Sequence, residues 1–127
     1  MDPISDMLIR IKNAQNAGHE MVRLSSSKFK YEIARALEAN GYVGNIERKG
    51  KRVKKTLEIE LRYSDELPAI KGITLISKPS NRVYAGSKEL NAGRKGGIIL
   101  VSTPKGVMSG RDARKQNLGG MLIAEIW

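Results

Sequence analysis

The spacing of apolar residues changes along this chain, and that change limits its fold more than any other feature of the sequence. Two stretches within the first 40 residues repeat apolar side chains at helical spacing. Residues 57–62 instead alternate apolar and charged side chains, as a half-buried strand does. A chain of 127 residues has room for one ordinary domain or two small ones. It is too short for a large catalytic barrel or a doubly wound nucleotide-binding enzyme of usual size.

Both predicted helices carry end signals besides their apolar stripes. Asp2 can cap the first helix, and Pro3 suits its first position. The serines at 25–27 can cap the second helix, which Asn40-Gly41 would stop. A weak alternation over residues 20–24 predicts a short strand between them. The inner stripes are Ile4, Met7, Leu8, Ile11 and Ala14 in the first helix, and Phe29, Ile33, Ala34 and Leu37 in the second.

Residues 42–62 predict a β-hairpin with a strongly basic connection. Val43 and Ile46 lie on its first arm, and residues 57–62 form the second. Between the arms, residues 48–55 hold six cations in eight positions, and such a block has to remain solvated. The block could supply phosphate contacts or be a basic loop without a defined partner, and the residues leave both readings open. We therefore expect an N-terminal α/β unit with the order helix-strand-helix-strand-strand.

The stretch 64–68 is the most linker-like in the chain, so we expect domains at 1–64 and 65–127. Beyond it the composition shifts towards Gly, Ser and β-branched residues, which predicts a mostly antiparallel β domain. One short helix should follow Ser109, with Asp112 completing its capping box. The predicted fold class is α+β. Strands are expected at 70–77, around 82–84, at 97–102 and at 121–127.

The chain is strongly basic over its whole length. It holds 23 Lys and Arg against 13 Asp and Glu, a net charge of +10. Residues 1–64 and 65–127 each carry +5, from 13 minus 8 and from 10 minus 5 charges. A folded surface of this charge attracts polyanions, either nucleic acid or an anionic membrane. With no cysteine, no long apolar run and no signal-peptide pattern, the sequence predicts a soluble, cytoplasmic protein.

Catalytic and metal-binding patterns are weak throughout. His19 is the only histidine and lies in a polar turn, where a histidine is more often solvated than catalytic. The glycine-rich stretch 93–97 lacks the spacing of a Walker loop, and the carboxylates are scattered. We expect no enzyme activity, no metal and no cofactor. A Ser-Lys hydrolase remains a minor alternative, on the Ser-x-x-Lys spacings Ser25/Lys28, Ser27/Lys30 and Ser102/Lys105.

Two segments could bind an anion or RNA. Lys28 and Lys30 begin the second helix, where the backbone N–H groups also favour a phosphate. The segment 101–106 leaves a buried-looking strand and presents hydroxyl groups, a lysine and a glycine together. Hydroxyls can bond base edges and 2′-OH groups in the shallow minor groove of RNA. From the residues alone, the two lysines could equally be solvated without a ligand, and the segment 101–106 could be an ordinary exit from a strand into a turn.

The second segment and the residues after it resemble the C-terminal signature of the small-subunit ribosomal protein eight family. The start of the chain, residues 2–13, is similar to the bacterial form of that family. The similarity runs from residue 2 to Trp127 with matching order and length. The matching stretches are Val101-Ser102-Thr103, Lys105-Gly106-Val107-Met108, Arg111, Ala113-Arg114, Leu118-Gly119-Gly120, Ser26-Ser27-Lys28, Ser77-Lys78-Pro79 and Arg82-Val83-Tyr84.

The resemblance implies a structural, primary rRNA-binding protein that supports assembly of the small ribosomal subunit. Members bind a helical hairpin in the central domain of the small-subunit rRNA and lie beside other ribosomal proteins. Some also repress their own operon by binding its mRNA. An off-ribosome RNA-binding translational regulator is the alternative. The resemblance places RNA-reading groups at Ser102, Thr103, Lys105, Gly106, Arg82, Tyr84 and Glu125, and backbone-binding cations at Lys28, Lys30 and Lys55.

Three of these positions leave alternatives open. Pro104 stands where most bacterial relatives have serine, which removes one hydroxyl and one backbone N–H and stiffens the turn. Tyr84 could stack on a base or pack between the domains. Glu125 could orient Lys105 or a hydroxyl, accept a hydrogen bond from RNA, or simply face outwards on its strand.

Overall fold

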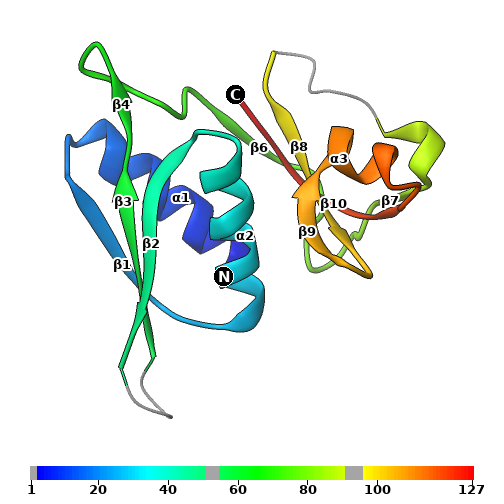
Figure 1. Ribbon diagram of the computed structural model, residues 1–127, viewed down its shortest axis with the longest axis horizontal. Helices are drawn as coiled ribbons and strands as arrows, with labels where there is room; N and C mark the ends of the chain where they lie inside the picture. Colours follow the sequence, from blue (N-terminus) through cyan, green and yellow to red (C-terminus); the bar gives the residue numbers. More distant parts are fainter. Residues whose placement is uncertain (1–2, 51–54, 91–95) are drawn as a thin grey trace. The chain divides into compact units, whose positions relative to one another are not determined.

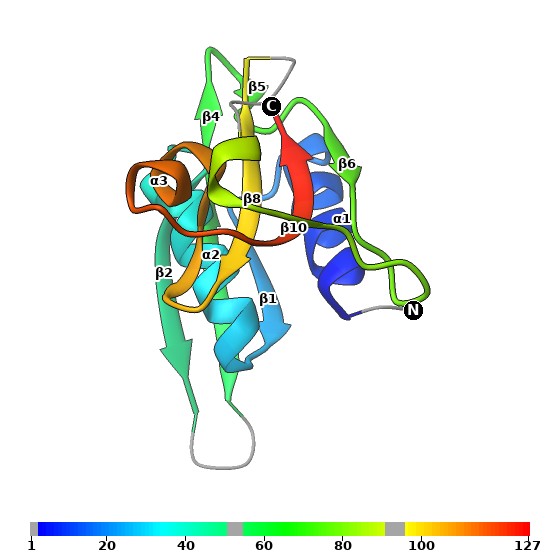
Figure 2. The same cartoon turned by 90° about the vertical axis from the view of Figure 1, so that its right-hand side faces the viewer.

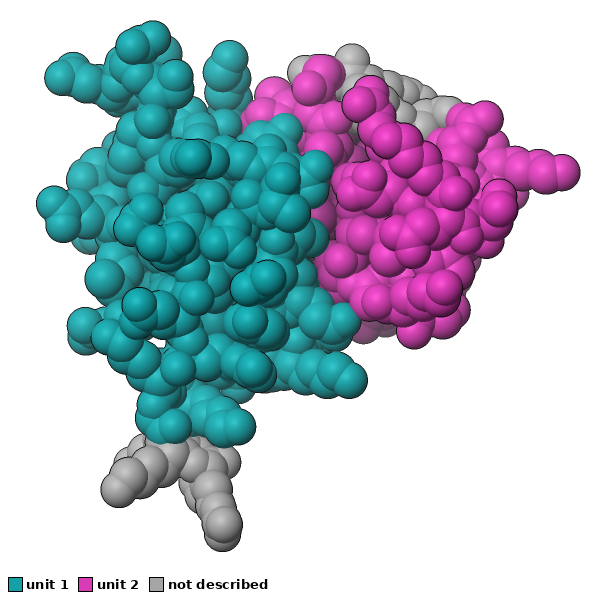
Figure 3. Space-filling model, viewed as in Figure 1, with its two compact units in different colours: residues 1, 3–71 teal, residues 2, 72–127 magenta. Residues whose placement is uncertain are grey.

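The computed structural model describes residues 3–50, 55–90 and 96–127. The chain forms two compact units, coloured separately in Figure 3. Unit 1 comprises Pro3–Lys71 and unit 2 comprises Gly72–Trp127. Both units combine helices with antiparallel strands, so the predicted α+β class is confirmed. None of the described helices combines the length and the apolar composition that crossing a bilayer requires.

The stretch that resembles a linker in the sequence folds as a small β-hairpin inside unit 1. Strand β4 (Tyr63–Ser64) pairs antiparallel with β5 (Leu67–Pro68). Asp65 and Glu66 form the turn with φ angles of 53° and 66°. This left-handed conformation is uncommon for residues other than glycine, so the residue types give little sign of so tight a turn. The division between the units consequently falls after residue 71 rather than after residue 64.

The described residues of unit 1 form two helices and a three-stranded sheet in the predicted order (Figure 1). The strands lie in the order β1-β3-β2, and both pairings are antiparallel. Ser27 caps the second helix by accepting a hydrogen bond from the Lys30 N–H at 3.2 Å. Gly41 follows that helix with a φ of 82°. The elements are α1 (Pro3–Asn16), β1 (Met21–Ser25), α2 (Lys28–Ala39), β2 (Val43–Lys49) and β3 (Thr56–Leu61). The Asp2 cap and residues 51–54 of the basic connection lie outside the described residues.

The core of unit 1 lies between the helices and one face of the sheet. Alternation along β3 sends Leu57, Ile59 and Leu61 to this face. Gln15 of α1 is also buried, with 1% of its surface exposed. Its amide donates to the carbonyls of Tyr42 and Arg62, and its oxygen accepts from the Ile70 N–H. The apolar core residues from the other elements are Met7, Leu8, Ile11, Val22, Leu24, Ile33, Ala34, Ala36, Leu37 and Val43.

Unit 2 is built on a sheet whose main path runs β6-β10-β8-β9, with β7 also paired to β10. Figure 2 shows β10 between β6 and β8. Its α-helix begins after Ser109, whose hydroxyl accepts from the Asp112 N–H at 3.2 Å, as predicted. Leu90, Val101 and Ala113 are buried together on one side of the sheet. The elements are β6 (Ile73–Leu75), β7 (Tyr84–Ala85), the 3₁₀ turn η1 (Ser87–Glu89), β8 (Ile98–Thr103), β9 (Gly106–Ser109), α3 (Gly110–Lys115) and β10 (Gly120–Ile126).

The strands of unit 2 differ from the prediction in extent. β6 covers only part of the expected stretch 70–77, and β7 has two residues. Residues 106–109, where the sequence predicts no strand, form β9 and pair along β8 from Leu100↔Ser109 to Thr103↔Gly106. A strand of four residues that begins with a glycine shows too little periodicity to be predicted from the sequence. It forms because it pairs with β8.

Candidate RNA-binding surface

The segment 101–106 is a tight β-hairpin rather than a loose strand exit. Thr103 pairs with Gly106, which leaves only Pro104 and Lys105 in the loop. The Thr103 hydroxyl donates to the Gly106 carbonyl at 2.7 Å and accepts from the Lys105 N–H at 3.1 Å. Gly106 has a φ of 115°, a conformation that side chains rarely adopt. The Thr103 side chain is therefore used to shape the turn.

This geometry separates the roles of the two hydroxyl groups. Thr103 has only 8% of its surface exposed, and both hydrogen-bonding functions of its hydroxyl are occupied. Ser102 is half-buried, and its hydroxyl makes no hydrogen bond within the described part of the chain. Lys105 and Pro104 are both exposed. Ser102 and Lys105 can therefore meet a ligand directly, whereas Thr103 positions the backbone that carries them.

Tyr84 lies on the same face of the sheet as Ser102. Met121 of β10 is paired with Tyr84 on one side and with Ser102 on the other, and Ser102 is paired in turn with Val107. Directly opposed residues of antiparallel strands point to the same face. Tyr84 is 69% exposed, so its ring is not enclosed by the protein. The structure thus joins an aromatic ring, a hydroxyl and two apolar side chains in one row.

Glycine is required where β10 passes this row. A Cβ on Gly120 would lie 2.0 Å from the carbonyl oxygen of Ser102, and one on Gly119 would lie 2.6 Å from that of Ala85. Neither carbonyl oxygen can move away without disrupting the pairing of the strands in the sheet. The pair Gly119-Gly120 therefore lets β7, β8 and β10 approach closely enough to align the row.

Arg82 and Tyr84 are held by a buried serine. The Ser77 hydroxyl accepts from the Val83 N–H at 2.9 Å, and Ser77 is 5% exposed. The Leu122 N–H donates to the Val83 carbonyl at 2.8 Å, which attaches the segment to β10. Arg82 is exposed beside this anchored residue. The backbone carrying Arg82 and Tyr84 is consequently fixed although β7 has only two residues.

The structure does not bring Glu125 to the Ser102 row. Glu125 pairs with Ile99 and Thr74, and the bulge between Leu122 and Ala124 leaves it on the opposite face of the sheet from Ser102. Its Oε2 atom is enclosed and has no hydrogen-bond partner among the described residues. The described part of the chain therefore holds no contact from Glu125 to Lys105 or to the hydroxyl turn. Its role towards RNA stays a prediction.

The three predicted backbone-binding lysines gather at one end of unit 1. The Ser26 N–H donates to the Lys55 carbonyl at 2.9 Å, so the end of the basic connection adjoins the start of α2. Lys28 and Lys55 are exposed. The Lys30 ammonium donates to the Ser25 hydroxyl at 3.0 Å and to the Ser25 carbonyl at 3.3 Å. Two of the three ammonium groups are thus solvated, and the third is folded back onto the protein.

Nearby, an arginine stacks on a tyrosine that the sequence analysis did not single out. The Arg48 guanidinium lies 4.0 Å from the centre of the Tyr31 ring, and Arg35 lies 5.9 Å from it. Arg48 is exposed and begins the basic connection, and the stack anchors that end of β2 to α2. The six-cation block is thus attached to the fold at its first residue. Because helix and strand residues meet here, no sequence spacing indicates this contact.

The described residues contain no arrangement that resembles a catalytic centre. The Ser27 hydroxyl accepts from the Lys30 backbone N–H as a helix cap, and among the described side chains no lysine ammonium of the three Ser-x-x-Lys pairs bonds the hydroxyl of its own pair. His19 is exposed and offers its backbone carbonyl to the Tyr63 hydroxyl. Across the described ranges, no three acidic or histidine side chains are grouped as metal ligands. The glycine-rich stretch at 93–97 falls largely outside the described residues.

Comparison with known proteins agrees with the resemblance noted from the motifs. The family described as "Ribosomal protein S8" matches residues 2–127. The "Small ribosomal subunit protein uS8" of Erythrobacter litoralis is 43% identical over 127 residues, which cover 99% of this chain and 97% of that protein. The protein of the same name from Koribacter versatilis is 44% identical over 128 residues, covering 99% and 96%. The relatives thus match over essentially their full lengths, and this chain belongs to the ribosomal protein S8 family.

Proposed function

We propose that this protein is a non-enzymatic, structural component of the small ribosomal subunit that binds its rRNA and supports assembly. The observation that carries the proposal is the arrangement around the β8–β9 turn. There Ser102 presents a hydroxyl that makes no hydrogen bond to any described residue, in one row with the exposed ring of Tyr84, and the exposed Lys105 follows on a rigid turn. The membership of the family, whose relatives are named as small-subunit proteins, supplies the setting.

The two units would divide the work of binding. Cations at the start of α2, Lys28 and Lys55, would hold phosphate groups and set the register on the RNA. Ser102 would bond a base edge or a 2′-OH group, and Tyr84 would stack on a base or ribose. The target we propose is the one that the family resemblance implies, a helical hairpin in the central domain of the rRNA. Like any RNA helix, it offers both a backbone to follow and a minor groove to read.

A gel-shift titration at about physiological ionic strength tests the target, because salt decides how much sequence-blind binding remains. We expect the central-domain hairpin to bind more tightly than unrelated rRNA hairpins of equal length. Similar affinity for every RNA would contradict the proposal and favour a general RNA chaperone. Preference for the chain's own operon mRNA over the rRNA hairpin would favour the alternative of an off-ribosome translational regulator.

The hydroxyl contact is tested by Ser102→Ala. The variant would leave a buried hydrogen-bonding group of the RNA without a partner, which should weaken the complex by about 1–3 kcal/mol. Ser64→Ala, which removes an exposed hydroxyl from the small β4–β5 hairpin, serves as the matched control and should leave affinity unchanged. Equal affinity of the two variants would remove the β8–β9 turn from the mechanism.

The phosphate contacts are tested by the salt dependence of binding. Replacing Lys28 or Lys55 by Met should reduce the slope of log affinity against log salt by roughly one unit for each phosphate group that the variant no longer binds. Lys30→Met should change the slope less, because its ammonium is already bonded to Ser25. An unaltered slope in all three variants would mean that these cations are merely solvated.

A further inference from the structure

The sheet of unit 1 has a second face that differs from the rest of this basic protein. Its side chains point away from the buried core residues of β1 and β3. We call this surface the outer face, and its described members are Met21, Arg23, Asn45, Glu47, Lys49, Glu58 and Glu60. Most of these residues are exposed, including Met21 at 44%. The proposed RNA contacts use none of them.

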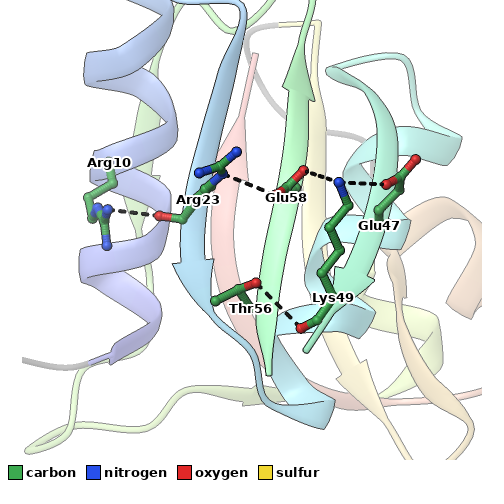
Figure 4. A network of polar contacts seen from close by, with 6 residues as sticks. All are labelled: Arg10, Arg23, Glu47, Lys49, Thr56 and Glu58. Atoms are coloured by element: carbon green, nitrogen blue, oxygen red, sulfur yellow. Dashed lines mark hydrogen bonds and ion pairs between the residues drawn. The ribbon is translucent and has the colours of Figure 1, made fainter. Parts of the chain in front are cut away.

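A network of ion pairs fixes the centre of the outer face (Figure 4). One carboxylate oxygen of Glu58 lies 3.0 Å from the Arg23 Nε atom, and the other lies 3.1 Å from the Lys49 Nζ atom. Lys49 also reaches Glu47 at 3.5 Å. The Glu58 side chain is only 10% exposed, and its two cationic partners offset the cost of burying its carboxylate. Both described cations of the outer face are consequently occupied.

The charge of the outer face opposes that of the whole chain. Three carboxylates face two cations, a sum of −1, whereas the chain carries +10, so the remainder of the protein carries +11. Glu60 has no ion-pair or hydrogen-bond partner among the described residues and is exposed. A phosphate backbone placed on these seven residues would meet three carboxylates and two cations that are already paired. The outer face therefore repels nucleic acid in a protein that otherwise attracts it.

Next to the network lies a hollow with both apolar and acidic walls. Met21 and Glu60 are directly opposed across β1 and β3, and they line it together with Asn45, Glu47, Lys49 and Glu58. Gly44 permits this position of Glu60, because a Cβ there would lie 2.4 Å from the Glu60 Oε1 atom. A thioether beside an unpaired carboxylate suits a lysine or arginine side chain, whose apolar stem and charged end need both surfaces.

We propose that the outer face docks a cationic segment of another polypeptide, with a lysine or arginine side chain entering the hollow between Met21 and Glu60. The inference rests on the proposed function for its setting, since the partner would be a neighbouring protein in the assembled small subunit. Charge complementarity selects a protein rather than RNA, and the fixed Arg23–Glu58–Lys49 network provides a rigid surface for it. The outer face would then make a protein contact while the basic surfaces bind RNA.

Carboxylate labelling in purified small subunits tests the docking directly. Carbodiimide with glycine ethyl ester should label Glu47 and Glu60 in the isolated protein, and this labelling should disappear in the subunit. Without the added amine, the reagent should join Glu60 to a lysine of another protein. Equal labelling in both states would overturn the proposal, as would protection that ends when ribonuclease removes the RNA while all proteins remain bound.

Charge reversal gives a second, independent test of the docking. The double variant Glu47→Lys with Glu60→Lys should lower retention of the cross-linked neighbour in reconstituted subunits by about tenfold, because like charges would then face each other. Asp65→Lys with Glu66→Lys, an equal charge change in the β4–β5 turn, should retain it. Equal retention would overturn the proposal. A failure of rRNA binding itself would instead appear as weak affinity of the unmodified protein for the RNA hairpin or as its absence from the subunit.

Discussion

Unit 1 and unit 2 reach the same mixture of helices and strands by different routes. In unit 1, two helices of 14 and 12 residues supply most of the apolar surface that covers the sheet. In unit 2, the α-helix α3 has six residues, and the sheet collects strands as short as two residues from along the chain. Unit 1 thus depends on long elements whose own sequences carry the apolar pattern, whereas unit 2 depends on pairing between distant segments.

The difference explains where the candidate contacts lie. Unit 1 presents cations at the start of a well-capped helix, which is a location that local sequence determines. Unit 2 presents Ser102 and Tyr84, which come from separate strands and meet only across β10. The contact that would discriminate among RNAs is therefore placed where its geometry depends on the whole sheet. Substitutions in each unit test that contrast.

Gly120→Ala should destabilise the protein most, because it acts on the pairing that holds unit 2 together. The new Cβ would meet the Ser102 carbonyl at 2.0 Å, so β8 and β10 would have to separate. We expect a loss of about 3 kcal/mol in the free energy of unfolding, with faster amide exchange in β8 and β10. The matched control is Gly96→Ala, where φ is +79° but no described atom lies within 4 Å, and where about 1–2 kcal/mol of strain is expected. Equal losses would contradict the close-approach argument.

Gln15→Ala should have the largest effect of a single polar change in unit 1. It would remove the hydrogen bonds that Gln15 makes to the Ile70 N–H and to the carbonyls of Tyr42 and Arg62, of which the Arg62 carbonyl also accepts from the Ala69 N–H. We expect chemical denaturation to show a loss of about 2–3 kcal/mol. Asn13→Ala on the exposed side of the same helix should change stability by less than about 0.5 kcal/mol. If Gln15→Ala were equally mild, unit 1 would not depend on this polar link.

Thr103→Val separates a positioning role from a contact role. The variant keeps the shape of the side chain but removes the donor to Gly106 and the acceptor for Lys105. We expect about 1–2 kcal/mol lower stability together with weaker binding to the RNA hairpin. Ser102→Ala should weaken binding while leaving the unfolding curve unchanged. Weaker binding by Thr103→Val at full stability would instead indicate direct contact with RNA.

The smallest predicted effect is the pH dependence that arises from Lys49. A hydrogen bond from Lys49 to Glu58 and the charges of Glu58 and Glu47 raise the pKa of Lys49 above its ordinary value of 10.5. Since the folded protein favours the protonated amine, the stabilisation is complete below pH 10.5 and declines as the pH rises through the folded pKa. The difference in unfolding free energy between the wild type and Lys49→Met should therefore stay constant up to about pH 10.5 and shrink as the pH rises further.

The control for this titration is Lys71→Met, which removes an exposed cation that has no ion pair in the described part of the chain. Its unfolding free energy should keep a constant offset from the wild type over the same range. A constant offset for Lys49→Met as well would show that the pairs with Glu58 and Glu47 contribute nothing to stability in solution.

Most of unit 1 could be predicted because each element carries its own signals. The helix cap at Ser27, the stop at Asn40-Gly41 and the alternation from residue 57 are confirmed in the structure. The β4–β5 hairpin could not be predicted, because Asp65 and Glu66 adopt positive φ angles that neither residue type demands. The docking of Arg48 on Tyr31 could not be predicted either, since it joins a strand to a helix.

The candidate site in unit 2 is less completely predictable. Family resemblance singles out the β8–β9 turn, but it gives Ser102 and Thr103 the same role and places Glu125 with them. The structure shows that Thr103 is committed to the turn and that Glu125 faces the other side of the sheet. It also adds Met121, which lies between Tyr84 and Ser102 and which no motif indicates.

Sequence alone was enough to establish that this chain is basic throughout, that it mixes helices with antiparallel strands, and which residues begin and end its long helices. Those properties depend on charge, periodicity and capping within a few residues of each other. The folded chain was needed to show which hydroxyl is available, which aromatic ring lies in line with it, and which face of unit 1 carries unpaired carboxylate. These follow from strand register and close approach between distant segments, because a one-residue shift in pairing moves every side chain to the opposite face.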